Sequence, residues 1–269
     1  MSESSRSTDV APAHALALAR EALSAVPAGL LADFDGTLSP IVSDPMRSRL
    51  VDGAHAALAA LAERLAVVAI VTGRAPLDAR RMAGVPGVFI AGNHGTEWLE
   101  PGSDAPIVAP EAAGMRAAIE DAIARLPRLE GIAVEDKGSS ASVHFRNAPD
   151  PDAALAAIEH ALRGIEEHGL RIGHGRMVVE LRPVGLGDKG TAARGIVERF
   201  GLRGVVVLGD DITDLDMFRA VSDLRRAGSV RAAIIGVGGA GGEVPPEVAE
   251  ATDVVLGGPA DAAALLARL

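Results

Sequence analysis

The sequence contains no cysteine. Disulfide bonds, thiolate-ligated zinc and catalysis by a cysteine nucleophile are therefore excluded. Long hydrophobic stretches are also missing, because the longest apolar run, 65–71, is far too short to cross a bilayer. The N-terminal residues show no basic segment followed by a continuous apolar core, so we expect no signal peptide. These absences predict a cytoplasmic protein with no membrane partner.

Aromatic residues are scarce: they make up 2% of the chain, with one Trp and no Tyr. Proteins that bind single-stranded nucleic acid stack the bases on aromatic side chains, and their affinity for phosphates needs basic surfaces. The net charge of -10 is unfavourable for such surfaces, so we expect no nucleic-acid partner. Hydrophobic residues still make up 48% of the sequence, which is ample for a core of Ala, Val, Leu and Ile.

Short apolar segments alternate with helical ones along most of the chain. The expected strands are 29–32, 67–71, 88–90, 205–208, 232–237 and 253–256, and the expected helices are 13–26, 53–65, 190–200, 214–220 and 260–269. This alternation predicts an α/β fold: a Rossmann-like parallel-sheet core with helices on both faces.

The alternation breaks in the middle of the chain. A hairpin is expected at 97–108, followed by helices at 112–126 and 152–167 and by strands at 132–135, 141–145, 170–172 and 177–181. Two helices on four antiparallel strands make a small α+β cap domain, inserted into the core. The predicted division is an N-terminal tail and helix (1–28), a core (29–104 and 184–269) and a cap (105–183).

Polar clusters follow the predicted strands at their carboxyl ends, where open α/β sheets bind ligands. Asp33 and Asp35 come directly after the first strand, and Gly36 lets the backbone turn sharply behind them. Their side chains fall on one side of the extended chain, and each raises the pKa of the other unless a cation neutralises them. Magnesium, a hard ion with oxygen ligands, suits such a pair. A plain strand-end turn is the alternative interpretation.

The segment 33–38, Asp-Phe-Asp-Gly-Thr-Leu, resembles the first motif of the haloacid dehalogenase superfamily of phosphohydrolases. The other three motifs of that superfamily follow in order. They are Thr72 at the end of the second core strand, Lys189 in the segment 187–190, and the acidic segment 209–214. Each match lies at a strand end or a helix start, so the four together carry the resemblance.

The resemblance implies a phosphatase that works through an aspartyl-phosphate intermediate. Asp33 would attack phosphorus, which splits one difficult step into two easier ones. Asp35 would protonate the leaving oxygen and then activate the water that hydrolyses the intermediate. Thr72 and Lys189 would stabilise the transferring phosphoryl group.

The same resemblance implies a magnesium site. Asp33, the backbone carbonyl of Asp35 and Asp210 would hold the ion, which offsets charge on the phosphoryl oxygens. Asp211 and Asp214 would orient these ligands from behind.

Within the superfamily, nearly all of 29–269 looks like the trehalose-6-phosphate phosphatase family. The likeness is carried by the segments 72–77, 92–97, 135–137, 144–146, 176–183 and 209–218. It implies that trehalose 6-phosphate is hydrolysed, the last step of trehalose biosynthesis. Carboxylates paired with Lys and Arg can bracket the hydroxyls of a disaccharide with charge-assisted hydrogen bonds. The residues expected to bind the substrate are Arg74, Asn93, His94, Glu135, Lys137, Arg146, Arg176 and Glu180.

Three positions depart from the family pattern: Leu215 replaces the usual acid, Gly187 replaces a bulky residue, and Arg176 replaces a common Lys. None is a predicted catalytic residue, so the departures bear on the sugar and leave the reaction class intact. Sucrose 6-phosphate and a glycosyl phosphoglycerate are alternative substrates for the same mechanism, and a phosphomutase would also use an acid at position 35. A sugar-phosphate-binding regulator without catalysis is the alternative from another class. The sequence makes no prediction of oligomeric state.

Overall fold

The computed structural model describes residues 10–42, 44–175, 177–239 and 243–269. The chain forms two compact units, Met1–Ile107 with Gly187–Leu269, and Val108–Leu186. The boundaries that the sequence predicts are 104/105 and 183/184. In the part of the chain that the structure describes, no helix combines the length and the apolar composition needed to span a bilayer.

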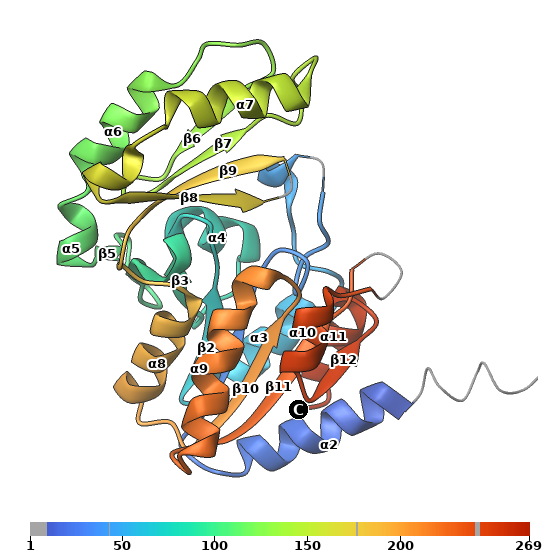
Figure 1. The fold of residues 1–269 in the computed structure, drawn as a ribbon. Helices are drawn as coiled ribbons and strands as arrows, with labels where there is room; N and C mark the ends of the chain where they lie inside the picture. Colours follow the sequence, from blue (N-terminus) through green and yellow to red (C-terminus); the bar gives the residue numbers. More distant parts are fainter. Residues whose placement is uncertain (1–9, 43, 176, 240–242) are drawn as a thin grey trace, which may run out of the picture. The chain divides into compact units, whose positions relative to one another are not determined.

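The first unit is built on one large sheet with the strand order β12-β11-β10-β1-β2-β3-β4-β5 (Figure 1). The parallel strands are β1 (Ala28–Ala32), β2 (Val67–Val71), β3 (Phe89–Gly92), β10 (Gly204–Gly209), β11 (Arg231–Val237) and β12 (Val254–Leu256). Antiparallel to β3 runs β4 (Glu97–Leu99), and β5 (Ile107–Val108) follows at the edge. The predicted α/β fold class is confirmed.

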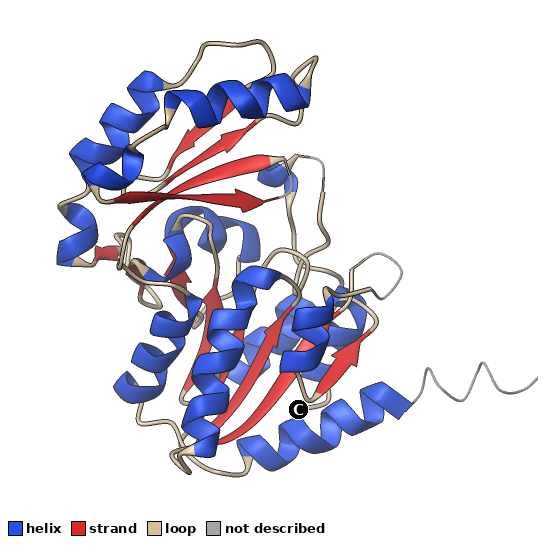
Figure 2. Ribbon diagram, viewed as in Figure 1, coloured by secondary structure: helices blue, strands red, loops and turns tan. Residues whose placement is uncertain are grey.

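Helices cover both faces of this sheet (Figure 2). One face, which includes Leu30, packs against α2 (Val10–Leu23), α3 (Ala54–Ala62), α4 (Pro76–Ala83) and α11 (Pro259–Leu266). The other face, which includes Leu31, packs against α8 (Lys189–Arg199), α9 (Leu215–Arg226) and α10 (Pro246–Ala251). Because successive side chains point to opposite faces and both faces are covered, the parallel strands are apolar except at Arg231, the exposed first residue of β11.

The second unit contains a four-stranded antiparallel sheet in the order β6-β7-β9-β8. The strands are β6 (Ala133–Asp136), β7 (Ala141–His144), β8 (Leu170–Gly175) and β9 (Val178–Pro183), and the helices of the unit are α5 (Pro110–Ala113), α6 (Arg116–Arg125) and α7 (Pro151–Ala161). Val143 and Val179 of the sheet share a buried cluster with Ile119 of α6 and Ile158 of α7. One sheet face is therefore covered by helices, as the α+β pattern of the sequence predicts.

Some helices differ from the prediction. The helix expected at 112–126 is divided into α5 and α6 around Gly114, where the low helix propensity of glycine permits a break. The helix expected at 152–167 ends at Ala161, because Gly164 adopts the left-handed conformation (φ 76°) and a separate 3-10 turn follows. The helix α10 was not predicted; Pro246 occupies its first turn, which proline tolerates.

Candidate active site

Three neighbouring strands, β10, β1 and β2, end at the same height of the sheet. Ala32 is in register with Leu208 on one side and with Ile70 on the other, and the amide of Asp33 donates to the carbonyl of Leu208 at 3.0 Å. The chain runs outward from β1 in both directions, so this is the switch point where open sheets bind ligands. The first residues past these ends include Asp33, Asp210 and Thr72.

The buried ammonium group of Lys189 lies between two buried carboxylates. Its Nζ donates to Asp33 Oδ1 and to Asp214 Oδ1, both at 2.7 Å. Lys189 is the first residue of α8, whose N-cap Asp188 accepts from the amide of Thr191 at 2.7 Å and so fixes the start of the helix. Burial alone would lower the pKa of Lys189, but the charges of Asp214 and Asp33 outweigh it and raise that pKa. The lysine is therefore held in its charged form.

Asp33, Asp210 and Asp214 form a cluster in which one carboxylate oxygen of each lies within 4.8 Å of the others. Both oxygens of Asp214 accept hydrogen bonds, Oδ1 from Lys189 and Oδ2 from the amides of Asp210 (2.9 Å) and Asp211 (3.1 Å). Asp210 Oδ1 accepts from Thr37 Oγ1 at 2.7 Å. Among the described residues nothing donates to Asp33 Oδ2 or Asp210 Oδ2, so these two oxygens fit a divalent cation.

Burial and mutual repulsion perturb these carboxylates. Burial raises the pKa of Asp33 well above its ordinary value, which the charge of Lys189 opposes and the charge of Asp214 reinforces. Burial, with the charge of Asp214 adding to it, raises the pKa of Asp210 to about 7. Excess negative charge therefore remains after Lys189 is counted, and a divalent cation would offset it.

Gly36 brings the loop after β1 against Asp210. Its backbone is left-handed (φ 85°), and a Cβ at this position would collide with the Asp210 carboxylate. Only glycine satisfies both conditions. The contact with Asp210 is thus a second reason for glycine at this position, in addition to the sharp turn that the sequence predicts.

The loops after β2 and β3 are joined through their backbones. The amide of Asn93 donates to the carbonyl of Arg74 at 2.8 Å, and that of His94 donates to the carbonyl of Thr72 at 3.0 Å. Asn93 and His94 are both left-handed (φ 48° and 58°), an uncommon conformation that clusters at functional sites. A Cβ on Gly73 would lie 2.6 Å from the His94 ring, so the ring packs directly on that glycine. The Asn93 side chain donates to Glu97 Oε1 at 2.7 Å.

Arg74 forms a two-pronged ion pair with Asp35. Its Nε donates to Oδ2 at 2.6 Å and its Nη2 donates to Oδ1 at 2.7 Å. The sequence singles out Arg74 as a contact to the substrate and does not predict this pair. Asp35 also accepts from the hydroxyl of Ser48 at 3.0 Å, a residue outside every motif that the sequence analysis identified.

In the second unit, the predicted substrate residues gather on one sheet face. Glu135, Ser142 and Glu180 form a cross-strand row, and Ser142 Oγ donates to Glu180 Oε1 at 2.8 Å. Lys137 Nζ lies 3.8 Å from Glu180 Oε2, and His144 Nε2 lies 3.3 Å from Glu135 Oε2. Because Val143 and Val179 take the alternate positions under the helices, this row is on the opposite, polar face.

Of the other two residues predicted in this unit, Arg146 is exposed just after β7, and Arg176 lies outside the described residues. Ser142, in contrast, was not predicted, because a serine in a strand carries no signal of its own.

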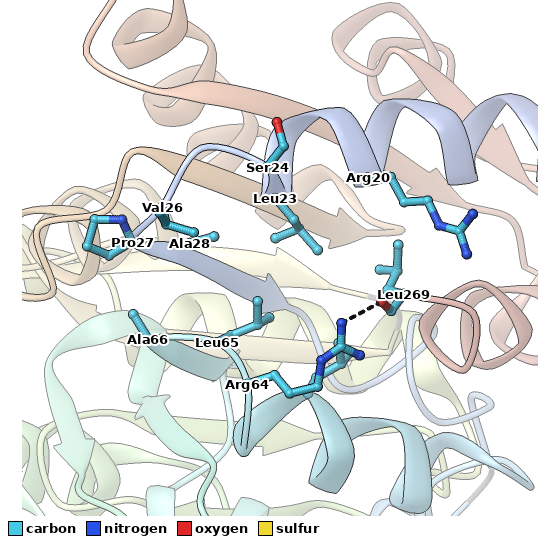
Figure 3. Close-up of a pocket in the computed structure, with 11 residues that line it drawn as sticks. Arg20, Leu23, Ser24, Val26, Pro27, Ala28, Arg64, Leu65, Ala66 and Leu269 are labelled. Atoms are coloured by element: carbon cyan, nitrogen blue, oxygen red, sulfur yellow. Dashed lines mark hydrogen bonds between the residues drawn. The ribbon is translucent and has the colours of Figure 1, made fainter.

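A separate cavity of about 440 Å³ lies at the other end of the sheet (Figure 3). It is lined by Pro27 and Ala28 at the start of β1 and by Ala66 just before β2, with Arg20 and Arg64 on its wall. These positions are at the amino ends of the strands, whereas Asp33 follows the carboxyl end of β1. The cavity is therefore not part of the candidate active site.

The chain resembles known proteins over most of its length. A family model described as trehalose-phosphatase matches residues 31–237. The trehalose-phosphate phosphatase of Mycobacterium avium (strain 104) is 41% identical over 202 residues, covering 70% of this chain and 50% of that protein. The corresponding protein of Mycobacterium bovis (strain BCG / Pasteur 1173P2) is 38% identical over 206 residues, with coverages of 70% and 50%. The chain thus spans about half the length of the curated relatives it matches.

A solved structure shares the fold. The C-terminal domain of trehalose-6-phosphate phosphatase from C. albicans superposes with a TM-score of 0.76 at 21% identity, covering 94% of this chain and 95% of that one.

Titration of the buried carboxylates gives a first prediction. Between the ordinary carboxyl pKa and about 7, folded Asp210 binds a proton that the unfolded chain has released. Without divalent cations, stability is therefore expected to fall as the pH rises from 5 to 8, and added Mg²⁺ should stabilise more at pH 8 than at pH 5. Thermal unfolding in EDTA and in Mg²⁺ across this range measures both effects.

The neutral variant Asp210→Asn should flatten the pH dependence in EDTA and reduce the stabilisation by Mg²⁺. Asp223→Asn, an exposed ion-pair residue of α9, serves as the control and should behave like the wild type. A wild-type stability that rises from pH 5 to pH 8 in EDTA would contradict the assignment.

Proposed function

Because the chain belongs to the trehalose-phosphatase family, we propose that it hydrolyses trehalose 6-phosphate to trehalose and phosphate, the last step of trehalose biosynthesis. The observation that carries the proposal is the buried Lys189 bridge from Asp33 to Asp214, with Asp210 beside it at the carboxyl ends of β1 and β10. A reactive carboxylate, a fixed positive charge and a cation site in one place are what phosphoryl transfer requires.

Asp33 acts as the nucleophile in this proposal. Its carboxylate attacks phosphorus, the bond to the sugar oxygen breaks, and an acyl phosphate forms on Asp33. Lys189 offsets the negative charge that gathers where carboxylate and phosphoryl group meet. Thr72, at the end of the neighbouring strand, donates its hydroxyl to the transferring group.

Asp35 acts as the proton carrier. It protonates the departing sugar oxygen, and its carboxylate then accepts a proton from the water that attacks the acyl phosphate. Inorganic phosphate leaves, and Asp33 is restored as a carboxylate.

Asp33 and Asp210 of the acidic cluster, with the backbone carbonyl of Asp35, would hold a magnesium ion. When bound, it supplies positive charge to the phosphoryl oxygens. Asp214 and Asp211 keep the ligands in place, because Asp214 bonds Lys189 and the backbone of the acidic loop.

Sugar recognition is assigned to residues of the second unit and to the loops after β2 and β3. The polar sheet face offers Glu135, Lys137 and Glu180, whose charges suit the many hydroxyls of a disaccharide. Asn93 and His94 of the first unit, and Arg146 and Arg176 of the second, are the further candidates.

The substrate assignment predicts phosphate release, in Mg²⁺, from trehalose 6-phosphate in preference to sucrose 6-phosphate, glucose 6-phosphate and glucosyl phosphoglycerate. Asp33→Asn should abolish release by removing the nucleophile, on the order of 10³-fold or more. Asp223→Asn should leave it unchanged. Preference for another ester would retain the mechanism and reject the substrate, and no release from any ester by the folded protein would favour a binding protein without catalysis.

The polar face of the second unit yields a matched pair of variants. Glu135→Ala should lower kcat/KM for trehalose 6-phosphate by on the order of tenfold, because a charge-assisted contact to the sugar is lost. Turnover of p-nitrophenyl phosphate, which lacks the sugar, should remain. Glu159→Ala is the control, since Glu159 also contacts a histidine (His174, 2.8 Å) but belongs to α7. Equal losses on both substrates would argue against a role in specificity.

A further inference from the structure

Ser48 is a buried residue in an otherwise open loop. It follows the 3-10 turn at Pro45–Arg47, whose residues are exposed, yet Ser48 itself is only 1% exposed. Burying a hydroxyl is unfavourable unless hydrogen bonds replace those it made to water. The residues that hydrogen-bond to this hydroxyl therefore indicate why Ser48 is buried.

Ser48 closes a ring of hydrogen bonds with Asp35 and Arg74. Its Oγ donates to Asp35 Oδ1 at 3.0 Å and accepts from Arg74 Nη2 at 3.0 Å. Arg74 also donates directly to both oxygens of the carboxylate. The Ser48 hydroxyl thus donates one hydrogen bond, to Asp35, and accepts one, from Arg74, and these two residues form an ion pair with each other.

The ring of hydrogen bonds restricts the Asp35 carboxylate, which packing alone would leave free to rotate. The Asp35 side chain is 35% exposed, and its main partner, Arg74, is long and has several rotatable bonds. Ser48 is short and buried, so its hydroxyl provides a fixed point against which Oδ1 is held. The Arg74 guanidinium is further confined by the Phe34 ring, 5.8 Å from its centroid.

Hydrogen bonds reach both oxygens of Asp35 and fix the orientation of its carboxyl group. Accepting a proton is the task of Asp35 in the second half of the proposed reaction. We propose that Ser48 is a positioning residue for that step, holding the Asp35 carboxylate where it takes a proton from the attacking water. The water oxygen bonds to phosphorus, the bond from phosphorus to Asp33 breaks, and the proton goes to Asp35. This inference rests on the proposed function.

The test separates breakdown of the acyl phosphate from its formation. Enzyme is mixed with trehalose 6-phosphate carrying a labelled phosphoryl group, chased with unlabelled substrate, and quenched in acid over time. In Ser48→Ala, decay of the labelled protein should slow by about tenfold, a part of what general-base catalysis contributes. The value of kcat/KM for p-nitrophenyl phosphate, whose leaving group departs without a proton from Asp35, reports formation of the acyl phosphate and should change by less than about twofold.

Two further variants serve as controls. Ser48→Thr keeps the hydroxyl and should restore decay toward the wild-type rate. Ser39→Ala removes another buried hydroxyl of the same loop, one that donates to the carbonyl of Pro40 at 3.3 Å, and should decay like the wild type.

Unchanged decay in Ser48→Ala would overturn the inference, as would an equal loss in decay rate and in kcat/KM for p-nitrophenyl phosphate. Failure of the proposed function is distinguishable, because the wild-type protein itself would then form no labelled intermediate, and the inference would fall with it.

Discussion

The rest of the site depends on one interaction: the charged side chain of Lys189 is buried between Asp33 and Asp214 and donates a hydrogen bond to each. Removing one partner of such a buried group leaves an uncompensated charge, which typically costs about 3–5 kcal/mol. The lysine joins three distant stretches of the chain, the end of β1, the start of α8 and the loop after β10. It therefore couples the integrity of the fold to the arrangement of the reactive groups.

The single positive charge does not balance the acids around it. Asp33, Asp210 and Asp214 together carry more negative charge than Lys189 offsets, and the raised pKa values of Asp33 and Asp210 express that excess. The arrangement is suited to a state with more positive charge, which a divalent cation supplies. Under the proposed function, such acids lie side by side because a cation and a phosphoryl group would bind among them.

Much of this site can be predicted from the sequence, because the reactive residues follow short apolar strands in an α/β pattern. Parallel strands in register bring Asp33, Thr72 and Asp210 to one edge, so sequence position alone implies proximity. Asp35 is predictable for the same reason, since it follows the end of β1. Lys189 is predictable only through its match to a superfamily motif, because a single lysine at a helix start carries no signal of its own.

The parts that could not be predicted depend on tertiary contacts. Ser48 lies in an irregular loop with no periodic pattern, and its burial against Asp35 and Arg74 follows from the folded path of that loop. Ser142 is a strand residue whose importance arises from its cross-strand neighbour Glu180. The division at Gly114 and the helix opened by Pro246 reflect weak local signals that the surrounding structure resolves.

The central claim is that Asp33 carries the phosphoryl group during turnover. Protein mixed with trehalose 6-phosphate and quenched within milliseconds can be reduced with borohydride, which converts an acyl phosphate to the alcohol, and then mapped by mass spectrometry. The account predicts that reduction changes position 33 and no other carboxylate. Phosphate release without any change at Asp33, or with the change at another residue, would contradict it.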